Sequence, residues 1–239
     1  MFNGFTEDTV QFFLDIRFHN EVAYMHARHD DYVRQVQQPF YQLISDLSPL
    51  MLSIDPDMEL RPSRCLSRIH RDTRYSTDKS PYRDHHWVAF RPAGLGKDGQ
   101  PFFWFEFGPD NLSWGAGLWG ENREAMNALR LRIVHESDRI LKLVKQLGRR
   151  GIVTGGASMQ RIKIPEDVPG SLHPLYRLKS VYFERTGIDW KWAFDSQLIQ
   201  RVQQDYMVLK PAYLLLKECV AASAQQAPAV PERIIREDF

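Results

Sequence analysis

The apolar residues of this 239-residue chain repeat with two different periods, and this change of period constrains the fold more than any other feature. Toward both ends they recur every three or four positions, which is the spacing of one face of an α-helix. Between about residues 64 and 119, short aromatic and β-branched runs are separated by turn-forming residues, a pattern typical of antiparallel strands. Because helices come before and after the strands and do not alternate with them, the order predicts an α+β fold.

Four stretches have helical spacing, at residues 6–20, 21–51, 121–147 and 195–222. Thr6 precedes two acidic residues, as an N-cap residue commonly does. Pro39 and Pro211 are expected to kink or divide the second and fourth stretches, because proline removes a backbone hydrogen bond from a helix. Gly148 stands where a helix C-terminus commonly places glycine, so it marks the expected end of the third stretch.

The clearest expected strand runs from Phe102 to Phe107. Alternate residues of a strand share a face, so three phenylalanines lie on one face while Phe102, Trp104 and Glu106 lie on the other. Its hairpin partner is expected at residues 86–91, joined through a glycine-rich loop. Further strands are expected at residues 112–119, 159–164 and 181–185.

The predicted central sheet is antiparallel, uses about residues 64–119 and 156–185, and packs against the N-terminal and C-terminal helices. The chain has 43% hydrophobic residues and neither an internal repeat nor a long linker, so residues 1–224 are expected to form a single domain. Residues 225–239 mix alanine, proline and charged residues and are expected to form a mobile tail.

The net charge limits the kinds of partner. The 31 Lys and Arg residues nearly balance 30 Asp and Glu residues, so no overall field draws the chain to nucleic acid or an anionic membrane. Cys65 and Cys219 lie in no metal-binding spacing and are too few for a disulfide framework. No export signal and no apolar run of about 18 residues is recognisable, which predicts a cytoplasmic protein without a membrane segment.

Positive charge is concentrated between Arg61 and Arg83. This segment holds seven Lys and Arg residues against two Asp residues, so it carries a charge of +5 and the rest of the chain carries −4. The planar fork of arginine suits bidentate contact with phosphate or carboxylate. The sequence therefore predicts a site for a small anionic ligand, and oligomeric state is left open.

Candidate roles follow from residue type. The expected ligand-binding residues are the four cations Arg68, Arg71, Arg74 and Lys79. Asp72, Asp78 and Tyr82 are the candidate catalytic residues, which orient the ligand or move a proton.

Two other interpretations use the same segment. In the first, the signature is structural: Asp72 and Asp78 accept from neighbouring cations and pin a strand to the following turn, so Asp72→Ala leaves an uncompensated buried charge and lowers stability. In the second, the cations act with nearby aromatic residues as a nucleic-acid or protein interaction module, although the net charge of +1 argues against it. The aromatic residues are interpreted first as core and second as a base-stacking platform: Trp87, Phe90, Phe103, Trp104 and Phe105.

Other motifs in the sequence give weaker evidence for a functional site. Gly115-Ala116-Gly117 lacks the spacing of a phosphate-binding loop, so its glycines are expected to permit close packing beside Trp114 and Trp119. Ser67 lies near His70, but no nucleophile-elbow motif is present and a hydrolase triad is not predicted. Three histidines lack an HExxH pattern and are not expected to bind metal: His19, His26 and His29.

Three pieces of the basic segment resemble the signature of the domain of unknown function 2461 family: Arg71-Asp72-Thr73-Arg74-Tyr75-Ser76, Asp78-Lys79 and Pro81-Tyr82. The similarity extends to the first helix, to Gly115-Ala116-Gly117-Leu118-Trp119 and to Leu129-Arg130, and it covers roughly residues 2–220. The resemblance implies a cytosolic protein without an assigned activity or catalytic residue, and no cofactor is predicted.

Overall fold

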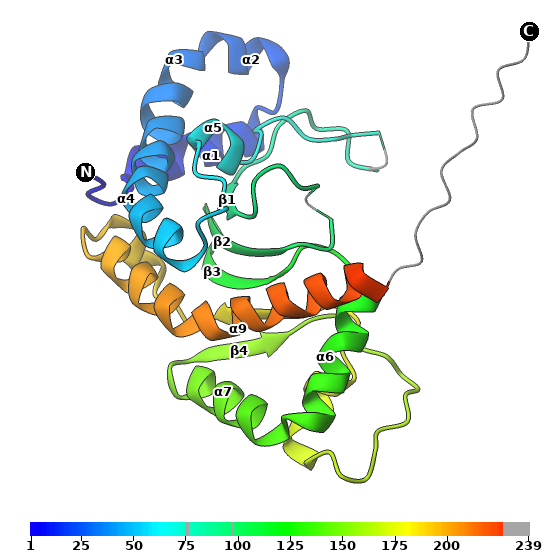
Figure 1. The fold of residues 1–239 in the computed structure, drawn as a ribbon. Helices are drawn as coiled ribbons and strands as arrows, with labels where there is room; N and C mark the ends of the chain where they lie inside the picture. Colours follow the sequence, from blue (N-terminus) through cyan, green and yellow to red (C-terminus); the bar gives the residue numbers. More distant parts are fainter. Residues whose placement is uncertain (75–76, 97, 227–239) are drawn as a thin grey trace, which may run out of the picture.

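The structure, a computed structural model, describes residues 1–74, 77–96 and 98–226. At its centre is a five-stranded antiparallel sheet with the strand order β1-β2-β3-β5-β4 (Figure 1). The strands are β1 (His86–Phe90), β2 (Pro101–Gly108), β3 (Asn111–Leu118), β4 (Ile152–Gly155) and β5 (Tyr182–Arg185). The predicted α+β class is confirmed.

Helices precede, interrupt and follow the strands. Those of the N-terminal part are α1 (Glu7–Phe18), α2 (Val22–Ala27), α3 (His29–Tyr32), the π-helix η1 (Val33–Gln37), α4 (Gln38–Ile54) and α5 (Pro62–Cys65). The later ones are α6 (Arg123–His135), α7 (Ser137–Arg149), the 3-10 helix η2 (Gly170–Leu172), α8 (His173–Tyr176), the 3-10 helix η3 (Trp190–Phe194) and α9 (Leu198–Gln226). None of the helices in the described part of the chain is long and apolar enough to cross a bilayer.

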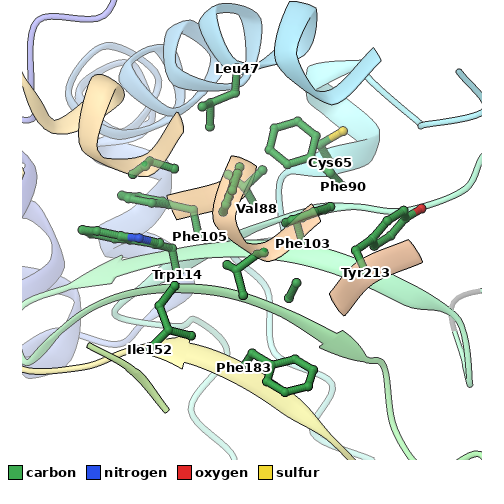
Figure 2. Close-up of a cluster of buried hydrophobic side chains, with 14 of the residues drawn as sticks. Leu47, Cys65, Val88, Phe90, Phe103, Phe105, Trp114, Ile152, Phe183 and Tyr213 are labelled. Carbon is green, nitrogen blue, oxygen red and sulfur yellow. The ribbon is translucent and has the colours of Figure 1, made fainter. Parts of the chain in front are cut away.

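The core lies between the inner face of the sheet and the helices α4 and α9. Figure 2 shows Phe103 and Phe105 of β2 and Trp114 of β3 beside Leu47 of α4 and Tyr213 of α9. All five side chains are 0% exposed. Burying each large apolar side chain contributes about 1.5–3 kcal/mol, so the alternation of phenylalanines along β2 fixes which face of the sheet turns inward.

The second predicted helical stretch is interrupted at Arg28, between α2 and α3, and not at Pro39. The π-helix η1 ends at Gln37 and continues directly into α4, so that next to Pro39 the helix type changes while the backbone stays helical. In a regular α-helix with another residue at position 39, its N–H would bond to the carbonyl of Gln35. Here the buried Thr9 hydroxyl donates to that carbonyl instead, at 2.6 Å, and joins α1 to η1.

Thr9→Val is expected to lower the free energy of unfolding by about 1–3 kcal/mol, because the carbonyl of the half-buried Gln35 then loses the Thr9 hydroxyl as a donor. The measurement is urea denaturation of both proteins. Thr186→Val, at an exposed position of similar chemistry, serves as the matched control and should keep the parent's midpoint. Equal losses in the two variants would show that the bond to Gln35 contributes nothing.

Two predictions about later elements were wrong. The third helical stretch breaks at Glu136, between α6 and α7, and Gly148 lies inside α7. The residue that leaves the helix with a positive φ is Gly151, at +72°. Residues 159–164, all of which are described, form no strand, and the strand in this region is β4. Of the predicted tail, 227–239 lie outside the described residues.

Candidate functional site

Short hydrogen bonds attach the basic segment to β1. The N–H of Ser67 donates to the carbonyl of Trp87 at 2.8 Å, and the N–H of Trp87 donates to the Ser67 hydroxyl at 3.1 Å. Beyond this point the segment turns back on itself, because the N–H of Arg71 donates to the carbonyl of Pro81 and that of Arg83 to Ile69, each at 2.8 Å. The arginine side chains therefore start from a backbone with fixed partners.

These side chains surround a groove with a volume of about 640 Å³. Volumes of roughly 300–1,000 Å³ are typical of small-molecule sites. Six arginines line the groove: Arg64, Arg68, Arg71, Arg74, Arg83 and Arg91. Asp72 is the single acidic residue among the described residues of its wall. The predicted surplus of cations thus lies around one hollow.

Ion pairs neutralise some of these arginines. The guanidinium of Arg74 donates to both carboxylate oxygens of Asp72, at 2.9 and 2.7 Å, and Arg71 pairs with Asp78. These carboxylates are 53% and 48% exposed, so the pairs lie at the surface. Hydrogen bonds from Arg74 and from Ser80, respectively, are the largest causes that hold the pKa values of Asp72 and Asp78 below their ordinary range.

The other arginines of the groove have no carboxylate partner within the described part of the chain: Arg64, Arg68, Arg83 and Arg91. Arg83 donates to the carbonyls of Arg68 and His70, at 2.9 and 2.5 Å, and its guanidinium lies 4.9 Å from the ring centroid of Trp87. Burial lowers the pKa of Arg83, the positive charge of Arg71 lowers it further, and the Asp72 carboxylate opposes them in part. Arg83 is thus a partly buried cation whose surroundings do not fully compensate its charge.

A second hollow, of about 350 Å³, adjoins the groove on the outer face of the sheet. Trp87 and Trp119 line both hollows. The second one is lined besides by Phe102, Trp104, Glu106, Leu118, Tyr182 and Glu184. The interpretation of the aromatics as core is therefore right for Phe103 and Phe105, which are 0% exposed, and wrong for Trp87 and Trp104, which are half-buried around a cavity.

Glycines allow the aromatic rings of this hollow to lie close to the sheet. A Cβ atom on Gly115 would overlap the ring of Trp104, and a Cβ on Gly155 would overlap the ring of Tyr182. The predicted close packing at Gly115 is confirmed, although its partner is Trp104 and not Trp114, which points into the core. These rings therefore lie directly against the backbone of the sheet, and we call the aromatic surface that they form at the bottom of the second hollow the aromatic floor.

A family model described as a conserved hypothetical protein (DUF2461) matches residues 8–214. The chain belongs to the DUF2461 family. This confirms the family that the resemblance named, and the match spans every described residue that lines the two hollows. No curated protein matches the chain.

In this DUF2461 protein the predicted site residues fall into two groups. Those that line the groove are Arg68, Arg71, Asp72 and Arg74. Lys79 and Asp78 are not among the described residues of its wall: Lys79 donates to the carbonyl of Thr73 at 2.7 Å, and Asp78 pairs with Arg71, which does line the groove. Tyr82 is 3% exposed, and Asn20 binds both its N–H and its carbonyl, each at 2.9 Å. Tyr82 is therefore buried beneath the basic segment, where its contacts are structural.

Two carboxylates also line the second hollow, and neither was among the predicted site residues. Glu106 and Glu184 come from β2 and β5, on opposite sides of β3. Burial raises the pKa of Glu184, the nearby Glu106 carboxylate raises it further, and a hydrogen bond from Ser113 opposes them. His85 Nε2 lies 3.9 Å from Glu106 Oε1. The described residues include no group of three or more side chains suited to hold a metal ion.

Ser67 also contacts a histidine, though not the one close to it in sequence. Its hydroxyl lies 2.8 Å from Nδ1 of His86, whose Nε2 lies 3.0 Å from the Tyr32 hydroxyl. His86 is 0% exposed, and the rings of Phe13 and Phe40 pack against it. The imidazole is not among the lining residues of the groove, whereas the half-buried Ser67 is, so the network joins the core to the groove wall through the Ser67 hydroxyl.

Proposed function

We propose that the groove binds a small anionic ligand that carries a phosphate or carboxylate group. One observation supports this most strongly: four arginines without a carboxylate partner in the described residues surround a single hollow of about 640 Å³. Like charges at close range repel each other, and an anion among them removes this repulsion while accepting several charge-assisted hydrogen bonds.

Asp72 and Asp78 have an orienting role in this proposal. Each holds one arginine of the groove wall through an ion pair, Arg74 and Arg71 respectively. Their exposure, 53% and 48%, argues against the alternative in which Asp72 is a buried charge that secures the fold, since exposed pairs contribute little to stability. We assign no chemical step to the groove, and proton transfer by Asp72, Asp78 or Tyr82 is not part of the proposal.

Charge reversal tests the groove directly. Arg68→Glu is expected to weaken binding of inorganic pyrophosphate roughly tenfold or more, because a charge-assisted hydrogen bond is replaced by repulsion. The measurement is isothermal titration calorimetry, supported by the rise in melting temperature that a bound ligand produces. Arg161→Glu makes the same change of charge at an exposed arginine outside both hollows and should bind like the parent.

Two results would count against the proposal. One is a parent protein whose melting temperature responds to none of pyrophosphate, phosphorylated metabolites and polycarboxylates. The other is an equal loss of affinity in Arg68→Glu and Arg161→Glu, which would mean that pyrophosphate responds to net charge alone.

A further inference from the structure

The arginine groove has a neighbour whose chemistry is different. It opens beside the aromatic hollow, and the two share Trp87 and Trp119 in their walls. One ligand can therefore place an anionic group among the arginines and another group against the outer face of the sheet. Resting on the proposed function, we infer that the ligand is a nucleotide, whose base stacks on the aromatic floor and whose phosphate lies in the arginine groove.

The aromatic residues support a flat ring in this position. Phe102 lies between two indoles, with ring centroids 5.4 Å from Trp104 and 5.0 Å from Trp119, and its ring is tilted by 31° to Trp104. Trp119 meets Phe102 edge-on and Tyr182 is nearly perpendicular to Trp104, at 6.1 Å, so these two rings form walls beside the floor. Gly115 and the other outward-facing glycines let these rings lie against the backbone. Stacking of a base on such a surface strengthens binding about 5- to 150-fold per base and needs no particular base sequence.

The two carboxylates at the floor add hydrogen-bond acceptors to the stacking surface. Ionised carboxylates accept and do not donate, so they suit the amino groups of adenine, cytosine or guanine. The raised pKa of Glu184 has a direct cause in the structure, since its carboxyl is partly buried and Glu106 is close by. An amino group between them would donate to both and reduce this repulsion.

A ligand that spans both hollows therefore contacts different kinds of side chain at its two ends. The arginines without a carboxylate partner in the described residues lie in the groove, and Trp87 and Trp119 line both hollows. Glu106 lies directly across from Trp87 in the register of β1 and β2, and Glu184 lies further from the groove, on β5. A nucleoside monophosphate has the matching order of phosphate, sugar and amino-bearing base. A simple oxyanion or a polycarboxylate fills only the first part, and a sugar phosphate has no aromatic ring for the floor.

Calorimetric titration of the full chain with AMP, adenosine, ribose 5-phosphate and inorganic phosphate tests the inference without any variant. AMP is expected to bind about 5- to 150-fold more tightly than ribose 5-phosphate or inorganic phosphate, because stacking of the base adds to the affinity. If ribose 5-phosphate or phosphate binds as tightly as AMP, the nucleotide inference is overturned while the anion site stands. If none of the four binds, both fail.

Two variants then separate the two ends of the ligand. Trp104→Leu should weaken AMP and adenosine by about 5- to 150-fold, the range that corresponds to one lost stacking contact, and leave ribose 5-phosphate unchanged. Arg68→Ala should weaken AMP and ribose 5-phosphate and leave adenosine unchanged. Trp192→Leu, at a half-buried tryptophan outside both hollows, is the matched control. AMP affinity that is the same in Trp104→Leu and the parent overturns the stacking assignment.

A single-stranded oligonucleotide provides the last arm of the experiment. Tighter binding of an oligonucleotide than of AMP, with an affinity that falls steeply as salt rises, would overturn the assignment to a mononucleotide and favour a nucleic-acid surface instead. The assignment to a mononucleotide is supported if AMP binds, the oligonucleotide binds no more tightly than AMP, and adenosine competes with AMP for the same site.

Discussion

Acidification from pH 7 to pH 5 is expected to lower the free energy of unfolding by about 2 kcal/mol through His86 alone. Burial lowers the pKa of this histidine to about 3, and the neighbouring His85 and Arg83 contribute to the shift. The folded protein therefore keeps His86 neutral over this range, whereas the unfolded chain takes up a proton near its ordinary value of 6.5. Because the unfolded state binds more protons between these two values, stability falls as the pH falls from about 6.5 toward 3.

Chemical denaturation at a series of pH values measures this slope. His86→Gln should be less stable than the parent at pH 7, since it disturbs the bonds to Ser67 and Tyr32, but its stability should change much less between pH 7 and 5. His135→Gln, at an exposed histidine, should keep the parent's slope. Parallel curves for the parent and His86→Gln would show that protonation of another group causes the loss.

Asp205→Ala is expected to lower the free energy of unfolding by about 3–5 kcal/mol, the usual effect of breaking a buried ion pair from one side. The carboxylate of Asp205 is 4% exposed and accepts from Trp114 Nε1 at 2.8 Å and from two nitrogens of Arg185, both at 2.7 Å. Its removal leaves the indole N–H without this acceptor and leaves Arg185, whose side chain is 23% exposed, without its carboxylate, although the Arg150 carbonyl still accepts from the guanidinium.

Urea denaturation of three variants resolves this prediction. Asp205→Asn keeps an acceptor oxygen and should lose less stability than Asp205→Ala. Asp30→Ala, at a carboxylate that is 108% exposed, should unfold at the same urea concentration as the parent. A midpoint for Asp205→Ala close to the parent's would mean that the rest of the core accommodates Arg185 without its partner.

The elements that the sequence located correctly are those in which the apolar spacing continues over many consecutive residues. The alternation from Phe102 to Phe107 specifies both β2 and its inner face, and the apolar spacing after residue 195 specifies α9. The strand β4 has only four residues, and it forms because β5, nearly thirty residues later, offers its backbone. Such pairing leaves no local signal. The break at Glu136 was hidden because helical spacing continues on both sides of it.

The candidate site divides in the same way. An excess of cations could be counted along one segment, so the arginine groove was predicted in outline, but which arginine meets which acid depends on how the segment turns. Arg91 and Glu184 come from outside that segment and meet the groove and the hollow only through the fold. The aromatic floor shares strands with core phenylalanines, and Glu106 beside Trp104 was the one sign that this face points outward.

The attachment of the basic segment to β1 also matters for how the protein behaves among other copies of itself. β1 is the last strand on its side of the sheet, and an uncovered strand at an edge offers free N–H and C=O groups to which another chain can add. The backbone around Ser67, which bonds to Trp87, occupies part of that edge. Side-chain changes to the arginines leave this cover in place, whereas a change that detaches the segment would expose an aggregation-prone strand.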